Sequence, residues 1–144
     1  MHVPLDDRVR RWLDQATADL EISRLLRETY AHQACFHAQQ SAEKALSAYL
    51  TRLSGDALPT HEIERLLTAC VRTGADLPDD VRADARSLDK YYVATRYPDA
   101  LGFADAALTY QARDADVAID AASRVRAWCD AGIEAARRDD PTPP

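Results

Sequence analysis

Residues 34–53 read ACFHAQQSAEKALSAYLTRL and carry the clearest helical pattern in the chain. Mostly apolar side chains recur there every three or four residues, which is the spacing of one face of an α-helix. These positions are Cys35, Gln39, Ala42, Leu46, Tyr49, Leu50 and Leu53. Gly55 follows and is typical of a left-handed helix end. We therefore expect a helix over about residues 32–53 that forms the best-defined element of the fold.

The opposite side of this helix is polar. His37, Gln40, Lys44 and Ser47 recur at the same spacing, with Glu43 at the edge. Periodicity alone favours a solvated helix face, and the sequence neighbours Glu43 and Lys44 do not face each other. A ligand-binding face is the alternative, and a slight hint towards it is that Lys44 and Lys90 are the only lysines in the chain.

Helical spacing also predicts the rest of the fold. We expect helices over about residues 6–29, from a capping Thr60 to Gly74, from Pro78 onward, and over about residues 112–137. In the last of these, Val117, Ala121, Val125 and Trp128 form the expected buried stripe. Short connections favour antiparallel neighbours. The sequence predicts an all-α, antiparallel up-and-down bundle of about five helices, with one domain over residues 1–138 and a frayed tail over 139–144.

The first predicted helix is apolar on two sides. Trp12 and Leu13 lie on one side, whereas Ile22, Leu25 and Leu26 fall on another. A helix of this kind needs two packing partners. Either it lies deep in the bundle or its far end meets a second copy of the chain.

Composition excludes several function classes. The chain has 144 residues and a net charge of −6, so it offers no chain-wide basic surface for duplex DNA. No apolar run approaches the roughly 20 residues of a membrane span. Cys35, Cys70 and Cys129 are isolated in sequence, which favours core positions, a reducing compartment and a cytoplasmic location. We expect no cofactor and no metal site, since His61-Glu62 is followed by Arg65 where a zinc-protease motif needs a second histidine.

Two short motifs could carry chemistry. Arg96-Tyr97-Pro98-Asp99 is either a helix stop or a projecting guanidinium and phenol that hold a phosphate or stack on a base. Arg27 and His32 have the residue types of a ribonuclease pair, but they straddle a predicted turn. A solvated helix end is the favoured interpretation of that second pair.

Taken together, these motifs resemble the HEPN domain family over about residues 9–129. The resemblance rests on the run Gln39-Gln40-Ser41-Ala42-Glu43-Lys44-Ala45-Leu46 combined with Thr95-Arg96-Tyr97-Pro98-Asp99, and also on Trp12, Asp19-Leu20, Thr60-His61, Tyr91-Tyr92 and Asp114-Ala115. It implies a helical bundle that forms a homodimer. It also implies a nucleotide- or RNA-related role, commonly beside a minimal nucleotidyltransferase in a toxin–antitoxin-like pair.

The better-characterised branch of that family consists of metal-independent ribonuclease toxins with an Arg-x4-6-His motif. Here, positions 101–103 after Arg96 hold Leu101, Gly102 and Phe103, so the motif lacks its histidine. We therefore expect a binding module rather than an enzyme. The residues that the resemblance assigns to a ligand-binding cluster are Gln40, Glu43, Lys44, His61, Arg96, Tyr97 and Asp99.

Two further hypotheses remain. One is a ribonuclease in which Arg96 works with a histidine brought near by folding, of which His61 is the candidate. The other is a dimeric scaffold without a ligand, in which the polar cluster only sets the register of assembly. All the binding hypotheses require Lys44, His61, Arg96 and Tyr97 to converge in space.

Overall fold

The computed structural model describes residues 2–94 and 109–140, and all the regular structure in these residues is helical. The long helices are α1 (Leu5–Leu26), α2 (Ala31–Ser54) and α7 (Ala112–Asp139). Two shorter helices, α3 (Ile63–Arg72) and α4 (Asp79–Asp89), are followed by the single turn α5 (Tyr91–Ala94). The predicted all-α bundle of about five helices is confirmed.

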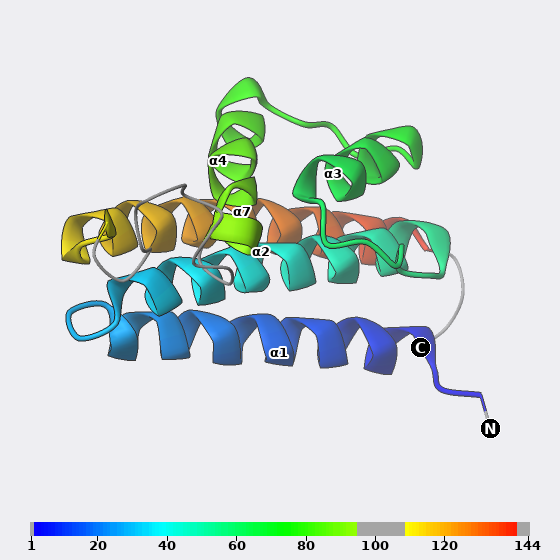
Figure 1. The fold of residues 1–144 in the computed structure, drawn as a ribbon. Helices are drawn as coiled ribbons and strands as arrows, with labels where there is room; N and C mark the ends of the chain where they lie inside the picture. Colours follow the sequence, from blue (N-terminus) through cyan, green and yellow to red (C-terminus); the bar gives the residue numbers. More distant parts are fainter. Residues whose placement is uncertain (1, 95–108, 141–144) are drawn as a thin grey trace.

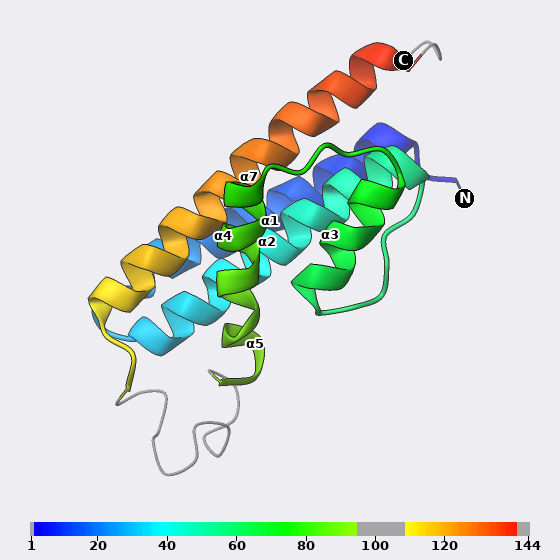
Figure 2. The same cartoon turned by 90° about the horizontal axis from the view of Figure 1, so that it is seen from above.

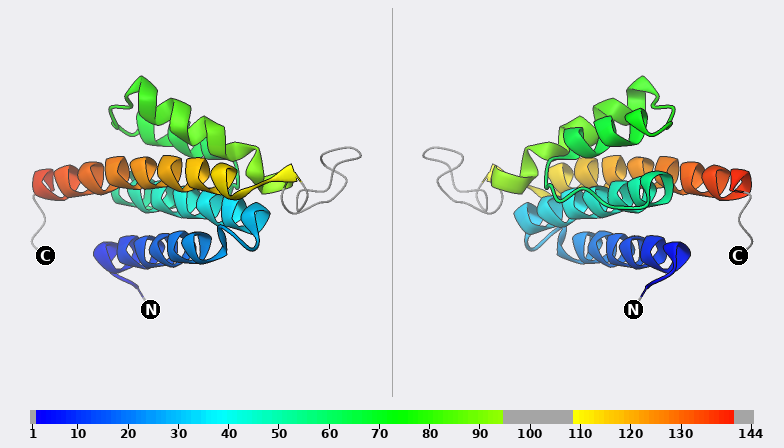
Figure 3. Two further views of the ribbon diagram at one scale, coloured as in Figure 1. Left: turned by 90° about the vertical axis from the view of Figure 1, so that its left-hand side faces the viewer. Right: turned by 90° about the vertical axis from the view of Figure 1, so that its right-hand side faces the viewer.

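Helix α2 lies at the centre of the bundle. It packs between α1 and α7, and α3 and α4 cover the side of the α2–α7 pair that faces away from α1 (Figures 1 and 3). Helices α1 and α2 run antiparallel. Helices α2 and α7 run in the same direction, because the chain returns past α3 and α4 before α7 begins (Figure 2). This central position explains why both sides of α2 are largely buried.

The core is built from small and branched side chains that line α2 and its neighbours. Fully buried members include Leu46, Ile63, Leu66, Leu67, Leu88 and Val125. Two hydroxyl groups join α1 to α2: Ser23 Oγ donates to Ala34 O at 2.6 Å, and Ser41 Oγ donates to Ala16 O at 2.7 Å. These bonds satisfy buried polar groups and hold the two helices at a fixed register.

The three cysteines occupy the core, as predicted from their apolar neighbours. All three are fully buried and unpaired. Burial raises the pKa of Cys35 and of Cys70 to about 12. Since the thiolate is the reactive form, these residues contribute packing rather than nucleophilic chemistry.

The predicted C-terminal end of α2 is confirmed, whereas the predicted N-terminal cap of α3 is not. Gly55 adopts φ 92° and its N–H bonds Thr51 O at 2.9 Å, so the predicted left-handed end of α2 is confirmed. The predicted Thr60 cap of α3 is wrong. Thr60 Oγ1 accepts the N–H of Glu62, and the first N–H of α3, that of Ile63, instead bonds the Asp89 carboxylate at 3.0 Å. The cap therefore comes from α4, which lies 26 residues away in sequence.

Two predictions about α7 need correction. Val117 is 63% exposed, because the buried stripe is centred on Ala118, Ala122 and Val125 instead. These alanines allow α7 to approach α2 closely. The helix also continues through Asp139, two residues beyond its predicted end at about residue 137, and Asp140 accepts a hydrogen bond from Arg52 at 3.1 Å. Residues 141–144 of the predicted tail lie outside the described residues.

Helix α1 lies at the outside of the bundle, so of the two alternatives the one that places it deep in the bundle is wrong. Val9, Ala16 and Leu20 pack inward, whereas Leu25 is 83% exposed. The second copy expected on this side stays a prediction. Among the described residues, no helix has both the length and the apolarity needed to cross a bilayer.

Candidate functional site

The polar side of α2 meets the chain segment before α3 through one carboxylate and one imidazole. His61 Nδ1 lies 3.0 Å from Glu43 Oε1. The Glu43 side chain is only 10% exposed, whereas that of His61 is 61% exposed. An ionised carboxylate can only accept, so in neutral His61 this contact places the proton on Nδ1 and leaves Nε2 as an acceptor. The pair thus fixes both the tautomer and the orientation of the ring.

Two glutamines complete the surroundings of the Glu43 carboxylate. Gln39 and Gln40 each donate an amide N–H to Glu43 Oε2, at 3.2 and 3.1 Å. Gln40 also donates to Gln39 Oε1 at 2.6 Å. Gln39 is fully buried although it stands in the mainly apolar stripe predicted from the sequence. A buried carboxylate with several donors is a satisfied, rigid acceptor.

The His61 ring stacks on Tyr92. The two ring centroids are 4.8 Å apart and the ring planes differ by 13°. Both residues line a pocket of about 690 Å³, together with Pro59, Thr60, Glu62, Asp89 and Lys90. The segment that precedes α3 and the end of α4 form this pocket, with Tyr92 contributed by α5. The two rings form an aromatic platform, and the buried Glu43 carboxylate fixes the orientation of its imidazole through Nδ1.

The two carboxylates at this pocket already have hydrogen-bond or ion-pair partners, whereas the ammonium group of Lys90 can take a further anionic partner. Asp89 caps α3, and Glu62 pairs with Arg65 at 3.2 Å. Lys90 is exposed, and its ammonium lies 5.1 Å from the centroid of the Tyr91 ring. A cation over an aromatic face retains its charge for a further anionic partner. Lys90 is therefore the ammonium group that this pocket offers.

Lys44 belongs to a neighbouring cluster. Lys44 Nζ donates to Asp19 Oδ2 at 2.6 Å, and His37 Nδ1 lies 3.0 Å from Asp19 Oδ1. The Asp19 side chain is 10% exposed, so this triad is largely buried between α1 and α2. The favoured expectation of a solvated face on α2 is wrong, because α1 covers much of it.

The structure thus brings together part of the predicted ligand cluster. Gln40, Glu43 and His61 form one hydrogen-bonded group, whereas Lys44 contacts α1. Arg96, Tyr97 and Asp99 lie outside the described residues, so their convergence with this group stays a prediction. Across residues 2–94 and 109–140, no group of histidines, cysteines and carboxylates is arranged to hold a metal ion.

Arg27 has a structural partner instead of His32. Its guanidinium makes two hydrogen bonds to the Asp116 carboxylate of α7, at 2.7 and 2.5 Å. His32 packs edge to face against Tyr30. Arg27 lies at the partly exposed end of α1, as the favoured interpretation of a solvated helix end predicts, and its pair with Asp116 ties this end to α7.

Sequence reasoning missed three contributors to these clusters. Asp19 and Tyr92 entered only as parts of the motifs that carry the family resemblance, and Lys90 only for the rarity of lysine. The adjacent aromatics Tyr91-Tyr92, placed shortly before Arg96, are the signal that could have found Tyr92. No local pattern pairs Asp19 with Lys44, because the contact spans 25 residues between two helices.

Comparison with known proteins agrees with this architecture. The sequence model of the HEPN domain matches residues 9–132. The crystal structure of TT1696 from Thermus thermophilus is similar at 38% identity and a TM-score of 0.79, over 87% of this chain and 98% of that chain. The structure of ST0689, an archaeal HEPN homologue, is similar at 36% identity and a TM-score of 0.69, over 87% and 97% of the two chains. Comparison with curated proteins gave no match.

Proposed function

Since this chain belongs to the HEPN domain family, we propose that it is a nucleotide- or RNA-binding module that acts as the partner of a minimal nucleotidyltransferase. The observation that carries the proposal is the stack of His61 on Tyr92 at the wall of a pocket of about 690 Å³. Stacked aromatic rings bind nucleobases with little regard to their sequence. In this proposal the base of the nucleotide stacks on the His61–Tyr92 pair.

The fixed orientation of His61 supports this role. Its bond to buried Glu43 keeps the ring in place before the ligand arrives, which lowers the entropy lost on binding. Ring nitrogen Nε2 remains as an acceptor for an exocyclic amine or a ribose hydroxyl. A mobile exposed histidine would offer neither advantage.

Cations supply the phosphate contacts in this proposal. Lys90 lines the same pocket as His61. Arg96 follows Tyr92 by four residues, and four residues of extended chain span at most roughly 14 Å. A guanidinium suits a phosphate because it donates two parallel hydrogen bonds. Arg96 and Tyr97 are therefore proposed as the other half of the binding group.

Calorimetric titration with ATP and with an unstructured hexa-adenylate RNA tests the binding role. We expect His61→Ala and Tyr92→Leu each to weaken binding by about fivefold or more, because stacking on one base contributes ~1–3 kcal/mol. Arg96→Ala is expected to weaken the binding of both ATP and the RNA, because it removes a phosphate contact. His32→Ala, which removes a histidine from the first turn of α2, is the matched control. Equal affinities for all four variants and the wild-type protein would refute the proposal.

The partnership needs a separate test. A tagged chain is co-expressed with the nucleotidyltransferase encoded beside it and purified by its tag. Co-purification that is reduced in Arg96→Ala supports the partnership. A neighbouring gene without a nucleotidyltransferase signature, or a partner that never co-purifies, counts against it while leaving the nucleotide-binding role to stand on the calorimetry.

A metal-independent ribonuclease is the second candidate, favoured by the Glu43–His61 pair. A histidine oriented by a carboxylate is a common arrangement for general acid–base catalysis. In this mechanism His61 Nε2 takes the proton of the ribose 2′-hydroxyl as that oxygen attacks the phosphorus, and the bond to the 5′-oxygen breaks. The protonated His61 then returns the proton to the leaving 5′-oxygen, directly or through a water molecule, while Arg96 stabilises the charge that develops on the phosphate. Incubation of RNA with the protein in EDTA discriminates between the two candidates. Cleavage that disappears in both His61→Ala and Arg96→Ala supports the enzyme, and intact RNA excludes it.

A further inference from the structure

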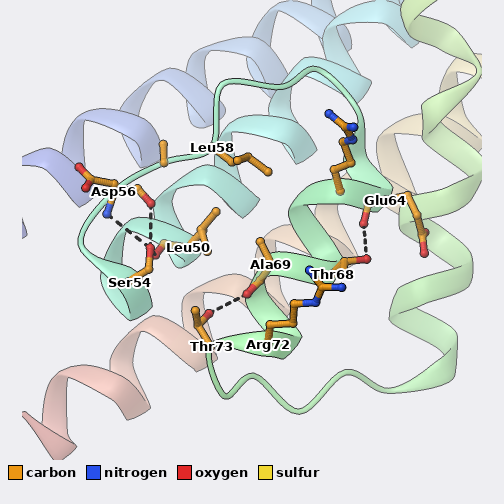
Figure 4. A pocket seen from close by; sticks show the side chains of 11 residues that line it. Leu50, Ser54, Asp56, Leu58, Glu64, Thr68, Ala69, Arg72 and Thr73 are labelled. Carbon is orange, nitrogen blue, oxygen red and sulfur yellow. Dashed lines mark hydrogen bonds between the residues drawn. The ribbon is translucent and has the colours of Figure 1, made fainter.

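A second pocket lies between the end of α2, the loop that follows it, and α3 (Figure 4). Its volume is about 580 Å³. Leu50 contributes from α2, Ala57 and Leu58 from the loop, and Ala69 from α3. These side chains give the pocket mainly apolar walls, and Leu58 is 39% exposed at its opening. The volume falls within the range of small-molecule sites, about 300–1,000 Å³.

The hydroxyl groups at this pocket are already engaged. Thr68 Oγ1 donates to Glu64 O at 2.9 Å, and Thr73 Oγ1 donates to Ala69 O at 2.8 Å. Ser54 Oγ donates to Leu50 O, also at 2.8 Å. Figure 4 shows the bonds of Thr68 and Thr73 running back to backbone carbonyl groups of α3. The body of a ligand here therefore meets apolar surface rather than free hydroxyl groups.

The charged groups at the pocket are paired, with one exception. Glu64 accepts hydrogen bonds from Arg86 at 2.9 and 3.0 Å, and Arg65 pairs with Glu62 at 3.2 Å. Asp56 lies 3.6 Å from Arg8. Arg72 alone among the charged lining residues has no hydrogen bond or ion pair to any residue in the described part of the chain.

We propose that this pocket binds a small amphipathic carboxylate, with its apolar chain against Leu50, Leu58 and Ala69 and its carboxylate on Arg72. The side chain of Arg72 extends along α3 towards Thr68, at the edge of the hollow (Figure 4). A guanidinium and a carboxylate form two parallel hydrogen bonds. One unpaired positive charge beside apolar walls matches a ligand with one negative charge and an apolar body. The site is independent of the nucleotide platform at His61.

Octanoate and the uncharged 1-octanol, which share the same chain length, serve as probes. Binding to the full chain is measured by calorimetry, with the methyl resonances of Ala57, Thr68 and Ala69 recorded by NMR. We expect saturable one-to-one binding of octanoate that shifts these methyl groups. Arg72→Gln is expected to weaken the binding of octanoate by about tenfold, in line with the loss of a charged hydrogen bond. The affinity for 1-octanol should not change.

Two further variants sharpen the test. Thr68→Phe introduces a ring at the pocket wall and is expected to weaken both probes. Arg113→Gln removes an exposed arginine at the start of α7, at the far end of the bundle, and is expected to change neither. The proposal is overturned if octanoate does not saturate, if Arg72→Gln binds it as tightly as wild type, or if the shifted methyl groups lie elsewhere. Because Arg72 is exposed, its substitution tests the site without disturbing the core.

Discussion

The imidazole of His61 is held by a carboxylate that belongs to the interior of the protein. Glu43 lies midway along α2, and its Oε1 is 3.0 Å from His61 Nδ1. The same carboxylate accepts from Gln39 and Gln40 through Oε2. All of these interactions require two acceptor oxygens at residue 43. An isosteric amide, which has only one, therefore tests whether the network orients His61.

Glu43→Gln should destabilise the protein and release the His61 ring. An amide at this position either points its NH₂ group at the two glutamine donors, which leaves them unpaired, or donates it to His61 Nδ1, which requires the other tautomer of the ring. In both orientations the charged acceptor of the network is lost. We expect the free energy of unfolding in urea to fall by about 1–3 kcal/mol. In nitrogen-15 NMR spectra, His61 is expected to lose its preference for the Nδ1–H tautomer.

Glu62→Gln is the matched control, since Glu62 lies beside His61 and its side chain, among the described residues, forms only an exposed pair with Arg65. Exposed pairs contribute little to stability, so this variant should resemble wild type. If Glu43→Gln has the stability of the control and keeps the His61 tautomer, the carboxylate does not orient the ring.

Asp19→Leu should destabilise the protein strongly, because Asp19 is buried between α1 and α2. It leaves Lys44 without its carboxylate between two packed helices, and removal of one partner of a buried pair costs about 3–5 kcal/mol when burial is complete. Because Lys44 is 24% exposed, we expect a loss of about 2–3 kcal/mol in urea unfolding. The double variant Asp19→Leu/Lys44→Leu should regain part of the loss. A double variant that is less stable than Asp19→Leu would contradict this account of the triad.

Local periodicity was sufficient to predict the helices but not the environment of each helix face. The apolar stripe of α2 was predicted correctly down to its Gly55 end, because helix propensity and capping act over a few residues. The polar stripe was misread, because only the tertiary fold shows that α1 covers Lys44. The Asp89 cap of α3 was missed for the same reason, since donor and acceptor lie 26 residues apart.

The candidate site was predictable only in part. Glu43 and His61 entered it through a family resemblance, and their contact joins residues 18 positions apart. Tyr92 follows the core residue Leu88 by four residues, which is the spacing of one helix face, so periodicity cannot distinguish a platform residue from a core residue at this position. Position on a helix specifies a face, whereas the function of that face depends on what packs against it.

The Arg27–Asp116 pair should make stability depend on acid pH. The hydrogen bonds and positive charge of Arg27 hold the pKa of Asp116 below its ordinary value. A carboxylate of lowered pKa stabilises the fold above its unfolded pKa, about 3.9, and this contribution is lost as pH falls through the lower folded value. We therefore expect Asp116→Asn to show a shallower fall in urea stability below about pH 4 than wild type.

Asp14→Asn controls for the loss of one negative charge. Asp14 is exposed on α1 and has no hydrogen bond or ion pair within the described residues. Below about pH 4, the urea stability of this control should fall with pH as steeply as that of the wild-type protein. An Asp116→Asn profile parallel to wild type over the same pH range would show that the pair does not contribute to acid stability.

Gly132 lies inside α7, where intrinsic propensity favours alanine by about 1 kcal/mol. Here we expect the opposite sign, because a Cβ at this position would overlap the ring of Tyr49, coming within 2.7 Å of Cε1. Tyr49 is buried and packs edge to face on Trp128 with centroids 5.0 Å apart, so it cannot move away freely. Gly132→Ala should therefore lower the free energy of unfolding by about 1–3 kcal/mol, as overpacking does.

In a Tyr49→Leu background the obstructing ring is absent, and the same substitution should become neutral or stabilising. Equal effects of Gly132→Ala in both backgrounds would mean that Tyr49 is not what requires glycine here.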